Sequence, residues 1–349
     1  MRCLVHIGIE KTGSTALQRV LRDNRNELSQ KGVYYGKSGG TLNSRAIAAG
    51  FVSLDRSDDY LAHRGMVDSE RRLAWRRGLF ESTRRDIGLA ERGHHKLYVL
   101  SSEHFSSRLS SREEVSNLVS FLRQDFDDIS IVCYLRRQDA LAVSRFSQAL
   151  RAGYVAPRLI PEFQKNSVLP DYYDFEGLLD RWATAIGSKN VEVKVYEPGQ
   201  LVGGNTVSDF LEDVLKVDLG VGHDVRANIS LNEDAQIALQ MFNVCLGQEM
   251  RGPAMRARRQ LVAFLEAHAL GQGKQPARHE AKKFYAKFKV ANNRVAMKFL
   301  NREKLFSEDF DCYPKKKSDP SWGPGLSLLS DYFSQQFSAN RFHHDADGA

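Results

Sequence analysis

The sequence predicts an α/β fold, in which a parallel β-sheet is flanked by helices and followed by a largely helical C-terminal part. Segments with the pattern of buried strands alternate with longer segments whose apolar residues recur at helical spacing. This alternation is typical of parallel sheets covered on both faces. The expected strands are residues 3–5, 31–36, 96–100, 129–135 and 191–196. The expected helices include residues 69–87, 111–124, 175–186, 207–215, 232–245, 254–270 and 280–300.

Length and composition predict one domain. The chain has 349 residues, of which 42% are hydrophobic and 27% are charged, as is usual for globular proteins. This length is enough to bury a full core, and no change in composition marks a boundary. We therefore expect a single domain over residues 1–337. The polar residues 338–349 are expected to form a disordered tail.

The net charge is positive and favours an anionic ligand. It amounts to +7 at pH 7, with an isoelectric point of about 9.1, and attracts anions at long range. The basic residues are interleaved with acidic ones, so we do not expect nucleic acid as a partner.

The spacing of the cysteines and the first residues of the chain indicate the cellular compartment. The four cysteines are widely scattered and form no pair with zinc-binding or redox spacing, so we expect no metal site and a reducing, cytoplasmic setting. The first expected strand begins almost at Met1, so we expect no signal peptide in this sequence. No apolar run approaches the length of a membrane span, although peripheral contact with a membrane stays open.

The segment His6–Thr15 joins the first strand to a helix through a glycine-containing turn. Leu17, Val20 and Leu21 recur at helical spacing after it, with Ser14 or Thr15 as the expected N-cap. Such a turn binds phosphate, because backbone N–H groups and the positive end of the helix dipole converge on one anion.

The spacing of this turn resembles a P-loop, G-x-x-x-x-G-K-[ST], but departs from it at one position. Gly8, Gly13 and Thr15 keep the pattern, whereas Ser14 stands where the lysine is required. The lysine comes earlier, as Lys11, so its charge is aimed at a different atom of the ligand. The alternative is an ordinary strand-to-helix turn with a solvated lysine.

Polar residues also follow two other expected strands, where open parallel sheets bind their ligands. Glu103 and His104 come after the strand 96–100, and Arg136 opens the helix after the strand 129–135. Ser144 follows Arg136 by eight residues, about two helical turns. Alternatively, Ser101 or Ser102 caps a short helix and Glu103 completes a capping box. We interpret His6 as a packed residue that braces the turn.

These motifs together resemble the sulfotransferases that use 3′-phosphoadenosine-5′-phosphosulfate (PAPS), and most closely their bacterial branch with a His-x-Gly-x-x-Lys-Thr-Gly pattern. The segments 195–198, 209–211 and 228–232 are similar to the same branch. The resemblance implies a P-loop-like fold. It implies that the 5′-phosphosulfate is bound by Lys11, Thr12, Gly13, Ser14 and Thr15, and the 3′-phosphate by Arg136 and Ser144.

The resemblance also implies the chemistry, which is transfer of a sulfuryl group from PAPS as co-substrate to an acceptor hydroxyl, an activity of the EC 2.8.2 type. Lys11 is expected to stabilise the charge on the leaving oxygen. Glu103 is the first candidate for the base and His104 the second. The branch resembled here often acts on carbohydrates or glycolipids, which are therefore the expected acceptors.

Two other functions stay open at this stage. A P-loop kinase or NTPase is disfavoured by Ser14 and by Arg136 in place of a magnesium-binding Asp, although Glu103 could mimic a Walker B acid. A non-catalytic module that binds polyanions would use Lys315–Lys317 and the basic helix over 282–298, but would leave Lys11 and Arg136 unexplained.

Overall fold

The computed structural model describes residues 1–66, 68–155, 158–163, 171–221, 230–247, 252–316 and 321–344. The chain divides into two compact units. The first comprises Met1–Arg137, Asn166–Ala227 and Phe288–Ser307, and the second Gln138–Lys165, Asn228–Lys287 and Glu308–Ala349. Each unit is assembled from three separate stretches, so compactness does not make either a separately folding domain. The expectation of one domain over residues 1–337 stays a prediction.

The first unit contains a five-stranded parallel sheet with the strand order β2-β3-β1-β4-β5. This confirms the predicted fold class. The strands are β1 (Arg2–His6), β2 (Val33–Tyr35), β3 (Leu97–Ser101), β4 (Asp128–Leu135) and β5 (Val191–Val195).

The register of the sheet aligns the last residues of β1 and β3, whereas β4 continues to Leu135 beyond this level. His6, the last residue of β1, lies opposite Ser101 of β3 on one side and Val132 of β4 on the other. After β1 the chain continues to β2 on one side of the sheet, whereas β4 is followed by β5 on the other. Open parallel sheets bind ligands at such a reversal of strand order.

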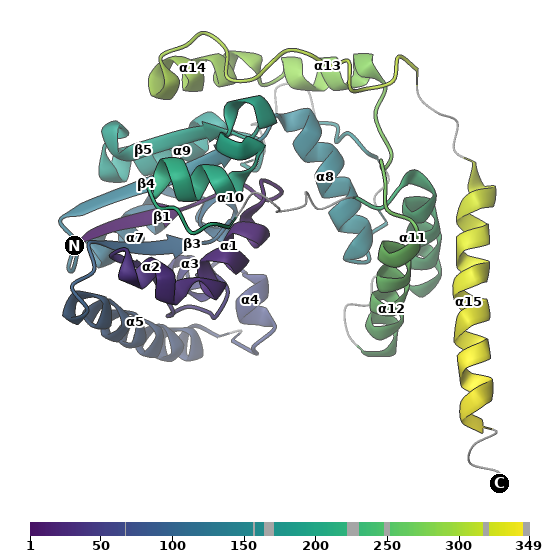
Figure 1. Ribbon diagram of the computed structural model, residues 1–349, viewed down its shortest axis with the longest axis horizontal. Helices are drawn as coiled ribbons and strands as arrows, with labels where there is room; N and C mark the ends of the chain where they lie inside the picture. The colour runs from purple at the N-terminus through teal and green to yellow at the C-terminus, as the bar shows by residue number, and fades with distance from the viewer. Residues whose placement is uncertain are drawn as a thin grey trace. The chain divides into compact units, whose positions relative to one another are not determined.

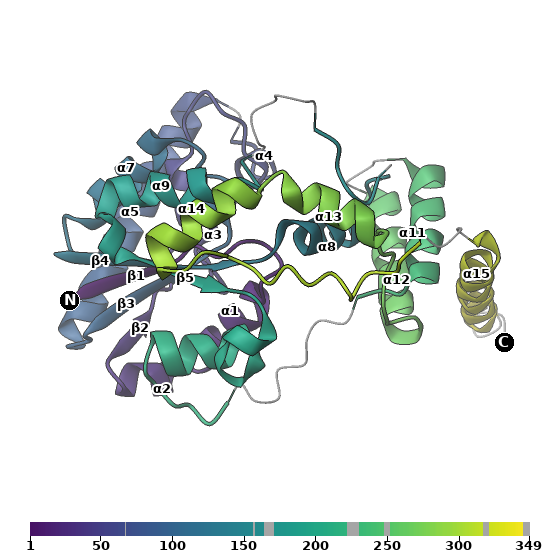
Figure 2. The same cartoon turned by 90° about the horizontal axis from the view of Figure 1, so that it is seen from above.

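Helices cover both faces of this sheet, with α1 and α2 on one side and α7 and α9 on the other (Figures 1 and 2). On the first side, Leu17 and Leu21 of α1 share a buried cluster with Val132 and Tyr134 of β4. The helices of the first unit are α1 (Ser14–Asp23), α2 (Arg25–Gln30), α3 (Arg45–Phe51), α4 (Asp59–Ala62), α5 (Ser69–Arg92), α6 (His104–Ser107), α7 (Arg112–Leu122), α9 (Phe175–Ile186), α10 (Thr206–Ser208), a π-helix over Asp209–Val214 and α14 (Lys289–Leu300).

The second unit is helical and has its own apolar core. Its helices are α8 (Gln138–Arg151), α11 (Glu233–Leu246), α12 (Gly252–His268), α13 (Arg278–Ala286) and α15 (Trp322–His344). Leu239 of α11, Leu265 of α12 and Tyr332 of α15 belong to one buried cluster. Helix α15 enters the segment expected as a tail, and residues 345–349 lie outside the described part of the chain.

The single helix predicted over 280–300 is wrong, because the structure has two helices there, α13 and α14. Phe288 lies between them with φ −107° and ψ −10° and is buried. In the first unit its ring packs against Tyr173, with centroids 5.8 Å apart. Phe284 packs in the second unit against Phe163, also at 5.8 Å. The apolar spacing continues across the break, so periodicity alone did not reveal it.

None of the helices in the described part of the chain has an apolar stretch that could cross a bilayer.

We expect Phe288→Ala to destabilise the first unit by about 3–5 kcal/mol, because a ring buried to 1% exposure is replaced by a cavity. Val290→Ala is the matched control. Val290 is 67% exposed, and its loss should change stability by no more than about 0.5 kcal/mol. Urea unfolding followed by the fluorescence of Trp182, on helix α9 that contacts α14, measures both. Equal losses would contradict an anchoring role for Phe288.

Candidate functional site

The loop between β1 and α1 has an unusual backbone. Lys11 and Gly13 both lie in the left-handed region, with φ of 72° and 85°. Such a conformation suits glycine but strains lysine, and strained residues concentrate at functional sites. The N-cap of α1 is Gly13 and no side chain caps the helix. The prediction that Ser14 or Thr15 serves as the N-cap is therefore wrong, since the turn needs a residue that tolerates positive φ.

Side chains from distant segments hold the carbonyl oxygens of this loop. Thr206 Oγ1 donates to the Thr12 carbonyl at 2.6 Å, and Ser106 Oγ lies 2.8 Å from the Gly8 carbonyl and 2.7 Å from the Glu103 carbonyl, which share its one proton. Within the loop, Thr12 Oγ1 donates to the Ile9 carbonyl at 2.8 Å. Carbonyl oxygens that would repel an anion are thus engaged by donors, while the first N–H groups of α1 have no intrahelical partner.

The floor of the loop presents polar atoms without partners. Ser14 Oγ and His6 Nε2 are buried and have no hydrogen-bond partner among the described residues. A Cβ atom on Gly8 would lie 2.6 Å from His6 Nε2 and 3.0 Å from Ser14 Oγ, so both atoms face this glycine. A buried hydroxyl without a partner at a helix N-terminus fits an oxygen of a bound phosphate or sulfate.

His6 braces the end of β1. Its Nδ1 lies 2.8 Å from Ser101 Oγ in a shared hydrogen bond. Its ring contacts Tyr134 and Phe210 edge-on, with centroids 5.8 Å and 5.5 Å away. Burial lowers the pKa of His6 to about 4, against the weaker opposing effect of Glu103. The imidazole is therefore neutral at pH 7 and packed, as we interpreted it.

Arg136 brings the end of β4 to the same loop. Its Nη1 donates to the carbonyl of Lys11 at 2.8 Å, and its guanidinium lies over the Tyr196 ring, 5.5 Å from the centroid. The guanidinium of Arg136 therefore contacts the backbone of the loop that carries Lys11, 125 positions earlier in the sequence. Ser144 lies in α8 of the second unit, and its pairing with Arg136 stays a prediction.

Glu103 and His104 follow β3 and are partly buried. Gln18, on α1, donates from Nε2 to Glu103 Oε2 at 3.0 Å. The nearest atoms of the Glu103 carboxylate and the His104 ring are 4.0 Å apart. The short helix α6 does begin here, and its His104 N–H donates to Ser102 Oγ. The Glu103 side chain makes no capping bond, so the capping-box alternative does not hold.

The surroundings of His104 keep its ring neutral. Burial lowers the pKa of His104, and the positive charges of Arg45 and Arg108 lower it further, while the charge of Glu103 acts in the opposite direction. The Nδ1 atom is buried without a partner among the described residues. A neutral imidazole can accept a proton, so both candidates for the base stay chemically competent.

The sequence reasoning missed the residues that position this site. Gln18 on α1, Ser106 on α6 and Thr206 on α10 all contact the loop or Glu103. Asn205 accepts from the N–H groups of Val207 and Ser208 and so caps the helix that the sequence predicted over 207–215, one residue before its observed start at Thr206. No local sequence pattern could have revealed the contact of Thr206 with Thr12, 194 positions earlier.

The aromatic residues of the segment 152–174 make contacts of different kinds. Tyr172 donates to Glu10 in the loop at 2.8 Å, and Tyr173 is buried against Phe288. Phe163 packs in the second unit. Residues 156–157 and 164–170 of this segment, and 228–229 of the third similar segment, lie outside the described residues.

Among the described residues, no three His, Cys, Asp or Glu side chains gather as a metal-binding cluster.

Comparisons with known proteins give limited similarity. No family model matches the chain. A stretch of 115 residues is 29% identical to an uncharacterised protein of Archaeoglobus fulgidus, and it spans 32% of this chain and 30% of that relative. The crystal structure of a sulfotransferase from Alicyclobacillus acidocaldarius aligns with 84% of this chain and 94% of its own, at 12% identity and a TM-score of 0.36. Neither similarity assigns a family, so any functional argument depends on the residues of this chain.

We expect the stability of the protein to depend on pH through His6. In the unfolded chain His6 binds a proton below about pH 6.5, whereas in the folded chain it does so only below about pH 4. The unfolded state therefore holds more protons between these values, and stability falls as the pH is lowered through this window. The loss amounts to roughly 3 kcal/mol.

Urea unfolding at pH 7 and pH 4.5 measures this effect. The variant His6→Asn lacks the titrating ring but retains a polar side chain that can reach Ser101. Other groups titrate in the same window, so the comparison is between the two proteins. An identical pH dependence in wild type and variant would show that His6 makes no such contribution.

Proposed function

We propose that the protein is a sulfotransferase that moves a sulfuryl group from PAPS to an acceptor hydroxyl by in-line displacement. The observation that supports this most strongly is the hydrogen bond from Arg136 to the Lys11 carbonyl at 2.8 Å. It brings the guanidinium of Arg136, which follows β4, to the backbone of the loop after β1 that carries Lys11. A donor with phosphate groups at both ends of a nucleoside needs two such positive positions.

The loop is proposed to bind the 5′-phosphosulfate. The N–H groups of Gly13 to Thr15 and the Ser14 hydroxyl hold the phosphate. The Lys11 ammonium stabilises the negative charge that develops on the oxygen between phosphorus and sulfur. Preorganised donors at such an oxygen lower the barrier, because they need no reorganisation as the charge grows. The left-handed backbone of Lys11 is a cost that such a role would explain.

Arg136 and Ser144 are proposed to bind the 3′-phosphate. The guanidinium is positioned by the Lys11 carbonyl and by the Tyr196 ring, and a planar guanidinium is the group that suits phosphate recognition. The role of Ser144 comes from the resemblance alone.

Glu103 or His104 is proposed to take the acceptor proton. As the acceptor oxygen bonds to sulfur, its proton passes to the base, and the electrons of the broken sulfur–oxygen bond stay with the phosphate. Gln18 holds the Glu103 carboxylate, and His104 is neutral because of burial and the neighbouring arginines.

The acceptor is proposed to be a hydroxyl on a carbohydrate or a glycolipid, with the reaction in the cytoplasm. The acceptor class follows from the resemblance, and the cytoplasmic setting from the scattered cysteines. Peripheral contact with a membrane would accompany a glycolipid acceptor. A kinase remains the alternative reaction, because Glu103 follows an apolar strand as a Walker B acid does. Ser14 in place of the P-loop lysine disfavours it.

We expect the protein to turn over PAPS in the presence of EDTA, since sulfuryl transfer does not need magnesium as triphosphate chemistry does. Lys11→Ala should lower kcat by about 10²–10³, the usual effect of removing one charge-stabilising donor. Lys31→Ala removes an exposed lysine after α2 and serves as the matched control. Release of adenosine 3′,5′-bisphosphate measures turnover. Activity only with ATP and magnesium would favour the kinase, and full activity of Lys11→Ala would remove its proposed role.

The base can be identified by two isosteric variants, Glu103→Gln and His104→Gln. The variant that lacks the base should lose about 10²–10⁴ in kcat and also the rise of kcat with pH on the acidic side. The other variant should keep this pH dependence. Retention of rate and pH profile in both variants would show that neither residue takes the proton.

A further inference from the structure

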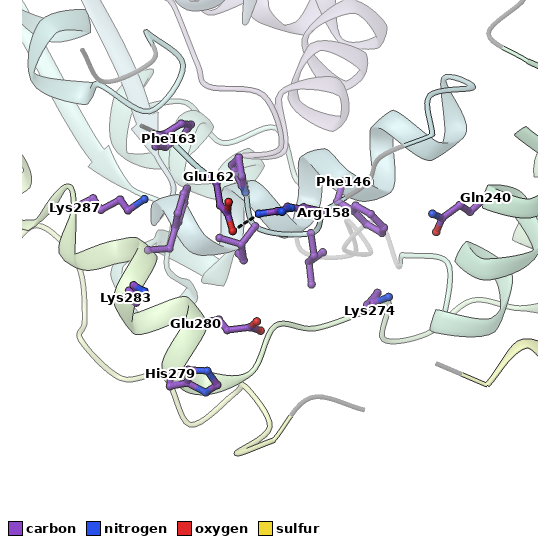
Figure 3. A pocket seen from close by; sticks show the side chains of 14 residues that line it. Phe146, Arg158, Glu162, Phe163, Gln240, Lys274, His279, Glu280, Lys283 and Lys287 are labelled. Carbon is purple, nitrogen blue, oxygen red and sulfur yellow. Dashed lines mark ion pairs between the residues drawn. The ribbon is translucent and has the colours of Figure 1, made fainter. Parts of the chain in front are cut away.

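The second unit contains a pocket that the proposed chemistry does not use. Its volume is about 730 Å³, within the range of small-molecule sites. It is formed by the segment 158–163, by α8 and α11, and by residues 274–287, which include α13 (Figure 3). All its lining residues belong to the second unit, so its shape does not depend on the first unit.

The pocket carries an excess of positive charge. Lys274, Lys283 and Lys287 line it, and none of them has an acidic partner among the described residues. The two acidic residues that line it have partners other than these lysines, and Arg158 adds a fourth cation to the lining. Glu162 pairs with Arg158, and Glu280 accepts from the Ala277 N–H at 2.8 Å at the start of α13. Three lysines in one concave site, with no acidic partner in the described part of the chain, favour a ligand with several negative charges.

The same pocket offers flat apolar surfaces and neutral polar groups. The rings of Phe163 and Phe284 lie with centroids 5.8 Å apart, and Lys287 Nζ is 5.3 Å from the Phe163 centroid. Gln240 and His279 complete the lining, and both can donate and accept hydrogen bonds. A ligand with a ring, hydroxyl groups and negative charges would use all three kinds of surface.

We propose that this pocket binds an acidic saccharide of one or two rings, held by Lys274, Lys283 and Lys287 and stacked on Phe163. An extended nucleic acid would need a basic stripe with repeated aromatic platforms, whereas these cations surround one concave pocket. The binding stands on the second unit alone. It does not depend on the proposed sulfuryl transfer. If that transfer occurs, an acidic saccharide belongs to the proposed class of acceptors.

Binding can be tested by titration calorimetry of the full chain with sucrose octasulfate as the probe and neutral sucrose as its uncharged counterpart. We expect the octasulfate to bind, with an affinity that falls as salt is raised, and sucrose not to bind detectably. Lys283→Gln and Lys287→Gln should each weaken binding about tenfold, because each removes a charge-assisted hydrogen bond. Phe163→Ala should also weaken binding, through loss of the ring surface.

The chain provides a matched control one residue away. Lys282 is on the same helix but lies over the Phe310 ring and does not line the pocket, so Lys282→Gln should change affinity less than twofold. Equal losses in the Lys282 and Lys283 variants would overturn the proposal, since they would indicate diffuse surface charge. A loss with Lys11→Gln but not with Lys283→Gln would overturn it too, by placing the probe in the loop of the first unit.

Two further probes test the class of ligand. Tripolyphosphate carries charge without a ring, and a single-stranded oligonucleotide carries charge with stacked bases. Tighter binding of either one, sensitive to Lys283→Gln, would overturn the saccharide assignment. Failure of PAPS turnover would leave these binding results unchanged, so this proposal and the proposed function fail separately.

Discussion

The loop after β1 depends on hydrogen bonds that other segments donate to its carbonyl oxygens. Ser106 engages Gly8, Arg136 engages Lys11, and Thr206 engages Thr12. These donors come from the region after β3, from the end of β4 and from α10. A backbone with positive φ at Lys11 is costly by itself, and the surrounding contacts hold it in place. The conformation of the loop therefore depends on all the segments that meet at this edge of the sheet.

Residues at the same edge of the sheet determine the protonation state of His6 and His104. His6 is neutral because burial excludes water from its ring, and His104 is neutral because burial acts together with nearby arginines. Glu103 opposes both shifts and is itself held by Gln18. The edge thus places neutral imidazoles and a carboxylate beside cationic side chains, an arrangement that suits proton removal next to a bound anion.

The sequence was least informative where local pattern and packing disagree. The apolar spacing over 280–300 continues through Phe288, yet the helix breaks there, with Phe288 packed against Tyr173 and Phe284 against Phe163. Ser14 has the side chain of an N-cap, but Gly13 takes that place because the turn requires positive φ. In both cases contacts distant in the sequence decided between conformations that the local pattern leaves open.

The sequence by itself determined the alternation of strands and helices, hence the parallel sheet, and the three strand ends with polar residues, because periodicity and strand-end polarity are local properties. Only the tertiary structure decided that Arg136 contacts the loop of Lys11, and that Gln18 holds Glu103. It also decided that α13 and α14 are separate and that three lysines share a pocket. The contacts of Arg136 with Lys11 and of Gln18 with Glu103 depend on strand order and packing between residues 125 and 85 positions apart, which no local pattern records.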